Sequence, residues 1–228
     1  MRGRPPKRKK GAYTAAERMR RYRRRLKRSR QSAKTVAKQG RRAEREAALA
    51  AATIKAAQVL GAILYGVLYV DPPWNFLVRN RETGMDRHAA NHYPVMSLED
   101  LAALELPAAK DCVLYLWAPI AQDANAQRLI EAWGFEYKSA HIWAKPDCGT
   151  GFWGLENAEL LLIATRGNVP CPAPGTQLPY LIEAPRGEPS EKPALFAEMI
   201  ERHWPNTPKL EMFARQPRDG WDSWGNEV

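Results

Sequence analysis

The chain has 228 residues and a formal net charge of +10, a size that suits one α/β domain with an appendage. Its longest strongly apolar run, residues 59–70, is too short to cross a bilayer, so we expect no membrane association. The arginine-rich N-terminus lacks a secretory apolar segment. The cysteines Cys112, Cys148 and Cys171 form neither a C-x-x-C pair nor a metal-ligand spacing with histidine. These features favour a cytoplasmic protein with reduced thiols and no metal site.

Basic residues are concentrated at the N-terminus. Residues 1–60 hold 21 Lys and Arg against 3 Asp and Glu, a balance of +18. The remainder holds 14 basic and 22 acidic residues, a balance of −8. Such segregation favours a polyanion as partner. We therefore divide the chain into a basic nucleic-acid-binding arm, residues 1–60, and a globular domain, residues 61–228.

The arm begins with a segment whose composition is typical of disorder, residues 1–12. It contains Arg2-Gly3-Arg4-Pro5 followed by a run of Lys and Arg, which resembles an AT-hook. In that interpretation Arg2 and Arg4 enter a narrow A·T minor groove. A generic polybasic tail is an equally good interpretation.

Residues 14–60 are rich in Ala, Arg, Lys, Glu and Gln, which favour helix. We expect one or two solvated helices with a break at Gly40. Leu26, Val36 and Leu49 form no sustained apolar stripe. We therefore expect these helices to be stabilised when they bind a phosphate backbone.

From residue 61 onwards, strand-like and helix-like segments alternate. Strands are expected at 63–70, 112–119, 135–145, within 154–167 and at 209–215, and helices at 98–106 after Ser97, at 121–134 and at 193–205. Residues 181–193 are predicted as a loop and residues 218–228 as a tail. This alternation predicts a three-layer α/β fold. The first strand is apolar on both faces, as in a buried strand of a mostly parallel sheet.

Asp71-Pro72-Pro73-Trp74 follows the first strand directly. Ligands of open α/β sheets lie beyond the carboxyl ends of strands. The prolines keep the backbone extended, so we expect the Pro72 carbonyl to point outward with free lone pairs. Asp71 and Pro72 can then accept both hydrogens of one amino group, while Trp74 stacks on an aromatic ring. That geometry suits a nucleobase amine activated by positioning. The competing interpretation is a stiffened loop with a core tryptophan.

Further motifs follow in order: HYPVMSLEDL (92–101), LYLWAP (114–119), HIWAKP (141–146), GFWGLENAELLLIATRG (151–167), SEKP (190–193), KLEMFAR (209–215) and GWDSWGNE (220–227). With DPPW, they closely resemble the family of the eukaryotic messenger-RNA adenosine N6-methyltransferase and its bacterial and phage relatives, over roughly residues 61–228. The resemblance implies a Rossmann-like fold with the catalytic motif ahead of the cofactor motif. It also implies S-adenosylmethionine as cofactor and adenine N6 as methyl acceptor.

The resemblance assigns roles to individual residues. Catalysis falls to Asp71, Pro72, Pro73 and Trp74, of which Asp71 also meets the cofactor's ammonium group. The remaining cofactor residues are Lys192, Glu211, Phe213, Arg215, Asn226 and Glu227, with Lys192 near the methionine carboxylate. The substrate side holds Tyr93, Trp143 and Lys145.

A further motif, G-x-G-x-x-G at 149–154, lacks the preceding strand and following helix of a dinucleotide site, so we interpret it as a substrate-side loop. The sequence as a whole predicts an adenine-N6 methyltransferase acting on DNA, associated with the nucleoid of a bacterial or phage-infected cell. The same reaction on RNA and a catalytically weak nucleic-acid-binding relative stay open, as do a monomer and a dimer. A nucleoid-type packing protein would explain only the arm.

Overall fold

The computed structural model describes residues 15–60, 63–74, 96–149, 153–188 and 190–225. The chain divides into two compact units, residues 1–41 and 42–228. Five of the predicted site residues lie outside the described residues: Arg2, Arg4, Tyr93, Asn226 and Glu227. The predicted AT-hook therefore stays a prediction.

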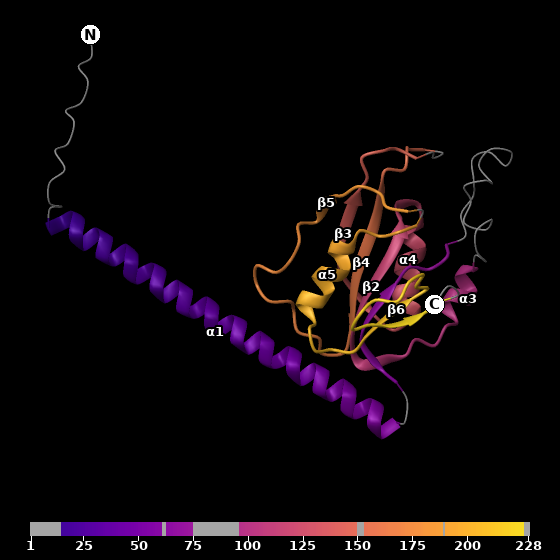
Figure 1. The fold of residues 1–228 in the computed structure, drawn as a ribbon, viewed down its shortest axis with the longest axis horizontal. Coiled ribbons are helices and arrows are strands. Elements are labelled where there is room, and N and C mark those ends of the chain that lie inside the picture. Colours follow the sequence, from indigo (N-terminus) through magenta and orange to yellow (C-terminus); the bar gives the residue numbers. More distant parts are fainter. Residues whose placement is uncertain (1–14, 61–62, 75–95, 150–152, 189, 226–228) are drawn as a thin grey trace, which may run out of the picture. The chain divides into compact units, whose positions relative to one another are not determined.

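The described residues of the arm form one continuous helix, α1 (Ala15–Leu60), of 46 residues (Figure 1). The predicted break at Gly40 is wrong. One glycine costs only about 1 kcal/mol relative to alanine in a helix interior, and the flanking Ala, Arg, Lys and Gln residues outweigh that cost. The helix ends at Leu60, where we placed the boundary of the arm, although the division of function between arm and domain stays a prediction.

The described residues of the domain form a seven-stranded sheet in the order β5-β3-β4-β2-β1-β6-β7. Its strands are β1 (Tyr65–Val70), β2 (Ala108–Pro119), β3 (Glu136–Ala144), β4 (Ala158–Arg166), β5 (Leu181–Glu183), β6 (Lys209–Met212) and β7 (Asp222–Trp224). β4 runs antiparallel to its neighbours β2 and β3, and every other neighbouring pair is parallel. The sequence prediction was wrong for β5, which was expected to be part of a loop, and for β7, which was expected to be part of the tail. Each of these strands is only three residues long.

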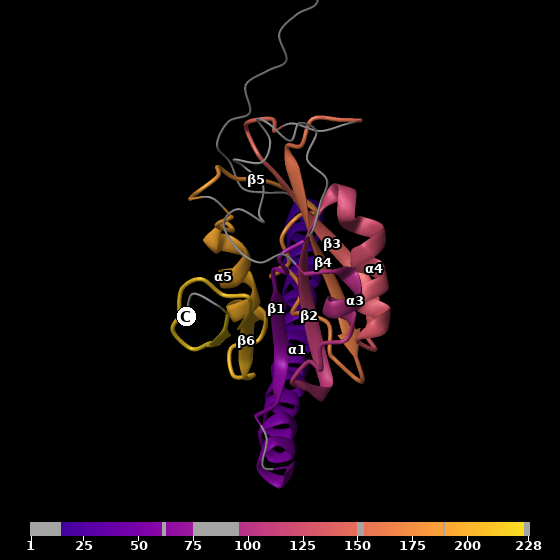
Figure 2. The same cartoon turned by 90° about the vertical axis from the view of Figure 1, so that its right-hand side faces the viewer.

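Helices cover both faces of the sheet. α3 (Leu98–Ala102) and α4 (Asp123–Ala132), the latter preceded by the 3₁₀ turn η3 (Ile120–Gln122), lie on one face, and α5 (Ala194–His203) lies on the other (Figure 2). The Ser97 hydroxyl caps α3 as predicted, accepting from the Asp100 N–H at 3.1 Å. In the described part of the chain, every helix is too short or too polar to span a bilayer. The three-layer, Rossmann-like α/β fold is confirmed.

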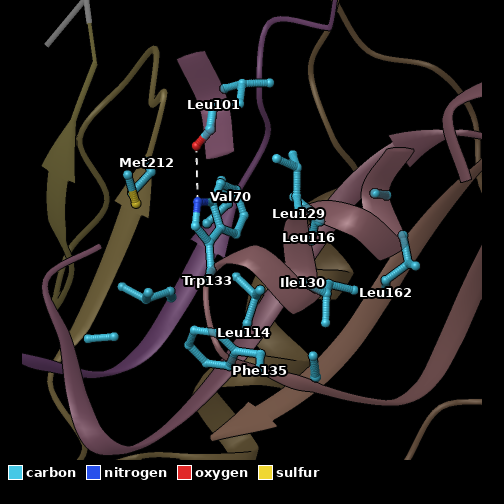
Figure 3. Close-up of a cluster of buried hydrophobic side chains, with 14 of the residues drawn as sticks. Val70, Leu101, Leu114, Leu116, Leu129, Ile130, Trp133, Phe135, Leu162 and Met212 are labelled. Atoms are coloured by element: carbon cyan, nitrogen blue, oxygen red, sulfur yellow. Dashed lines mark hydrogen bonds between the residues drawn. The ribbon is translucent and has the colours of Figure 1, made fainter. Parts of the chain in front are cut away.

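Apolar side chains fill both interfaces between helices and sheet. Under α3 and α4 the core includes Leu114, Leu129 and Ile130, and the Trp133 indole N–H donates to the Leu101 carbonyl at 3.0 Å (Figure 3). This bond ties the end of α4 to α3. The core under α5 is the more aromatic one, built around Trp117, Phe196 and Trp204.

Two segments far apart in the sequence meet at the centre of the sheet. β1 and β6 pair in parallel, with Val70 opposite Met212. The Asp71 N–H continues the ladder by donating to the Met212 carbonyl at 3.4 Å. The DPPW motif therefore lies beside the end of KLEMFAR at the same carboxyl edge.

Gly40→Ala should stabilise α1 locally by about 0.5–1 kcal/mol, because glycine loses more backbone entropy than alanine and a Cβ at this position meets nothing within 4 Å. Amide hydrogen exchange in the middle of α1 should slow correspondingly. Ala37→Gly, also exposed and three residues away, should accelerate it. Unchanged exchange in both variants would show that the glycine is not a weak point of this helix.

Candidate active site

The candidate site lies at the carboxyl edge of the central strands. Asp71 follows β1, Phe213 follows β6 and Lys145 follows β3. β4 runs in the opposite direction, so its beginning lies at the edge where the others end, and Glu159 there is opposite Pro119 of β2. The reversed strand thus brings a carboxylate to the edge at which ligands bind in such sheets.

Four charged side chains from separate segments form a continuous ion-pair network, which we call the Asp71 cluster: Asp71, Lys192, Glu159 and Lys145. Lys192 Nζ lies 2.7 Å from Asp71 Oδ2 and 3.3 Å from Glu159 Oε2. The ammonium of Lys145 bonds the other oxygen, Glu159 Oε1. The side chains are mostly buried, and Asp71 is the most accessible with 28 % exposed. Two positive and two negative charges balance one another, which low-dielectric surroundings require.

Burial and pairing shift the pKa values within the cluster in different directions. Burial raises the pKa of Asp71, and Lys192 opposes the shift without cancelling it. Burial acts in the same sense on Glu159, but Lys192 and Lys145 together lower its pKa. Burial works against the charge of Lys192, yet Asp71 and Glu159 raise its pKa. Lys192 is therefore held as a cation, and Asp71 is the carboxylate that most easily gains a proton.

Buried tryptophans support both ammonium groups. Lys192 Nζ lies 5.5 Å from the ring centroid of Trp117, and Lys145 Nζ lies 4.6 Å from that of Trp143. Such cation–π contacts favour a positive charge over the ring face. Trp143 is only 2 % exposed and its indole N–H donates to the Ala184 carbonyl at 2.9 Å. Trp143 therefore lies in the core as a support for Lys145, as is usual for a tryptophan in an apolar strand, and its assignment to the substrate side stays a prediction.

Trp74 is also part of the core. It is 6 % exposed, and its indole N–H donates to the Trp117 carbonyl at 2.9 Å. It belongs to the apolar core cluster that includes Val70 and Leu116, which agrees with the competing interpretation of a core tryptophan, and its stacking on a base stays a prediction. What Trp74 does in this structure is to fasten the segment after Asp71 to β2.

The backbone after Asp71 turns more tightly than expected. The Pro72 carbonyl accepts from the Trp74 N–H at 2.8 Å, which forms a γ-turn centred on Pro73. The proline ring fixes φ near the value that this turn needs. The expectation that the Pro72 carbonyl has both lone pairs free is therefore wrong. One lone pair remains for a ligand, since a carbonyl oxygen has two.

Three of the predicted cofactor residues lie at the end of β6 or just after it. Glu211 is half-buried, and burial together with Asp71 raises its pKa against the influence of Arg218. Phe213 adopts a left-handed φ of 63°, a strained conformation typical of functional sites, and its ring centroid lies 5.1 Å from that of Trp224. Arg215 follows, and its charge acts to lower the pKa of Asp71.

The segment after β7 lies directly on this turn. A Cβ on Gly225 would come within 2.2 Å of the Ala214 carbonyl oxygen, so only glycine fits there. The residues that follow, Asn226 and Glu227, lie outside the described residues. Among the described residues, no group of three His, Cys, Asp or Glu side chains is arranged to hold a metal ion.

Glu159 is the site residue that sequence reasoning missed. It begins the apolar run ELLLIA, and a charged residue at the start of a buried strand was the available signal. That signal gains meaning only when the strand is known to be reversed, because in a parallel strand Glu159 would lie at the opposite edge.

Comparisons with known proteins agree with this geometry. The MT-A70 family model matches residues 65–227. Type II methyltransferase M.MunI of Mycoplasma sp is 34 % identical over 181 residues, which cover 72 % of this chain and 78 % of that protein. A probable N(6)-adenosine-methyltransferase MT-A70-like protein of Oryza sativa subsp. japonica is 29 % identical over 175 residues, 72 % of this chain and 23 % of that protein. The N(6)-adenosine-methyltransferase catalytic subunit METTL3 of Homo sapiens is 26 % identical over 175 residues, 72 % of this chain and 28 % of that protein. The chain thus spans about a quarter of the length of these two eukaryotic relatives.

Glu159→Gln should lower the free energy of unfolding by about 1–3 kcal/mol, because Lys145 and Lys192 lose a charged acceptor in mostly buried surroundings. Urea denaturation measures the change. Glu136→Gln is the matched control: its ion pair with Lys138 leaves 78 % of the Glu136 side chain exposed, so the effect should stay within about 0.5 kcal/mol. Equal effects in the two variants would contradict a structural role for the Asp71 cluster.

Proposed function

The chain belongs to the MT-A70 family and is an adenine-N6 methyltransferase, and we propose that it transfers the methyl group of S-adenosylmethionine to adenine in DNA. The observation that carries the proposal is the position of Asp71. It lies beside the end of β6 and is held by Lys192 at 2.7 Å, so a base amine and a cofactor can meet at one edge of the sheet.

The chemistry of the side chains at this edge suits S-adenosylmethionine, which supplies an electrophilic methyl group. Its carboxylate needs a cation, its ammonium and ribose hydroxyls need acceptors, and its adenine needs an apolar neighbour. Lys192, Asp71, Glu211 and Phe213 provide these in turn, and Arg215, Asn226 and Glu227 complete the proposed set. Lys192 already donates to Asp71 and Glu159; its longest contact, 3.4 Å to the Ser190 carbonyl, is the one that a cofactor carboxylate would replace.

Asp71 and Pro72 are proposed to hold the adenine amine. Lys192 binds Asp71 at Oδ2, and Oδ1 can accept one amine hydrogen. The remaining lone pair of the Pro72 carbonyl accepts the other. The remaining lone pairs of the Asp71 carboxylate are then left for the cofactor ammonium. Two fixed acceptors direct the nitrogen lone pair away from the ring and towards the methyl donor, so catalysis rests on positioning. Lys145 and Tyr93 belong to the proposed substrate side.

DNA is favoured over RNA by two observations. The Mycoplasma relative is a Type II methyltransferase, a designation used for enzymes that modify DNA, and the match covers 78 % of it. The arm adds a charge of +18 ahead of a domain that carries −8, which suits a phosphate backbone. RNA is the second candidate, since several relatives are N(6)-adenosine-methyltransferases.

The proposal is tested by supplying labelled S-adenosylmethionine with DNA or RNA of mixed sequence and analysing the nucleosides. We expect N6-methyladenine in DNA. Asp71→Ala should lower the rate by ~10²–10³ while DNA binding stays unchanged, because Asp71 orients the amine whereas the basic arm is proposed to supply the affinity. The exposed Asp219→Ala should retain full activity. Label found only in RNA would transfer the proposal to the second candidate, and near-normal rates for a folded Asp71→Ala protein would refute the mechanism.

A second prediction concerns the arm. Arg20, Arg23, Arg24 and Arg25 are exposed on α1, and glutamine replaces arginine there without loss of helix propensity. Replacing all four should reduce the dependence of log K on log salt by up to about 4, since each phosphate contact contributes roughly 0.9. KM for long DNA should rise far more than kcat falls, because the reacting groups are untouched.

The control for this experiment replaces four exposed basic residues of the domain by glutamine: Lys110, Arg128, Lys138 and Arg202. Their replacement should leave the salt dependence nearly unchanged. A larger effect in this set than in the arm would place the nucleic-acid surface on the domain.

A further inference from the structure

The connection between β3 and β4 is a hairpin with a braced base. The Lys145 N–H donates to the Asn157 carbonyl at 2.7 Å, and the Gly149 N–H donates to the Glu156 carbonyl at 2.6 Å. From the loop that precedes α5, Arg186 Nη2 donates to the Asp147 carbonyl at 2.8 Å. The hairpin is therefore held from within and from a neighbouring segment.

The base of this hairpin is the Asp71 cluster itself. Lys145 follows β3 directly and opens the connection, and Glu159 is the second residue of β4, where the connection ends. The hairpin extends beyond the carboxyl edge of the sheet (Figures 1 and 2). A nucleic acid that brings an adenine to Asp71 would therefore pass close to the base of this hairpin.

Trp153 lies in the outer part of the hairpin and exposes its entire side chain, 103 % of the reference area. Leu155 nearby is 63 % exposed. In contrast, Trp74, Trp117 and Trp143 of the site are each 6 % exposed or less. A fully exposed indole on a segment that starts from the candidate site is a surface for an aromatic partner.

The reaction creates a need for such a surface. An adenine in a duplex has its N6 inside the base stack, so the target nucleotide must be rotated out to reach Asp71. That rotation costs unstacking energy and leaves a gap in the duplex. Apolar side chains that enter base steps offset such costs in other DNA-bending proteins.

We propose that Trp153 enters the base stack of DNA at the target site and occupies the gap left by the rotated adenine. This inference rests on the proposed function. The exposed carboxylates of Asp147 and Glu156 repel phosphates, so the exposed indole of Trp153 would meet the bases rather than the backbone. Trp153 would then lower the cost of extrusion without touching the reacting atoms.

The test uses the full chain and duplexes that contain an adenine site mapped in DNA methylated by the wild-type protein. In one duplex the target adenine is paired with thymine, and in the other it faces an abasic position, which removes its pairing. Trp153→Ala should lower the single-turnover rate on the paired duplex by ~10–100-fold, the range expected for one lost stacking contact. The abasic duplex should restore the rate to within about threefold of wild type, and Trp153→Phe should keep most of the activity on both.

Tyr137→Ala is the matched control, because Tyr137 is an exposed aromatic residue, 44 % accessible, at the opposite end of β3. It should leave both rates unchanged. Equal losses for Trp153→Ala on the two duplexes would overturn the insertion of Trp153 into the base stack and indicate a contact unrelated to base extrusion. An unchanged rate on the paired duplex would also overturn the proposal. A wild-type protein that methylates RNA alone would instead refute the proposed DNA substrate, and with it the insertion of Trp153 into DNA.

Discussion

The ion pairs of Lys192 are the interaction on which the site depends. One ammonium group joins the end of β1, the beginning of β4 and the loop before α5 by pairing with Asp71 and Glu159. Charges this deeply placed are tolerated only when each has a partner, so removing any one of them leaves another uncompensated. The cluster therefore holds three segments in place and keeps the carboxylate beside β6 oriented.

The direction of β4 is the second constraint. Because this strand is reversed between β2 and β3, its beginning rather than its end lies at the ligand edge. The same reversal makes the β3–β4 connection a hairpin instead of a crossover over one face of the sheet. One topological feature thus supplies both the carboxylate of Glu159 and the projecting segment that carries Trp153.

Affinity and chemistry are assigned to different parts of the chain. Residues 1–60 hold most of the positive charge, whereas the two cations and two carboxylates of the Asp71 cluster at the candidate site balance one another. A balanced site adds little long-range attraction for a polyanion, and we propose that the basic arm supplies that attraction. The balanced edge can then hold an uncharged base amine without competition from phosphates.

The sequence by itself determined the family, the alternation of strands and helices and the place of Asp71 after a buried strand, because these depend on local patterns and contiguous motifs. The helix cap at Ser97 and the stop at Gly134 follow from the same local rules. Tertiary structure decided what the motif residues do: Trp74 and Trp143 turned inward because apolar neighbours surround them on both sides of the sheet. It alone revealed Glu159, since a pairing between strands of opposite direction depends on residues distant in the chain, which no local pattern records.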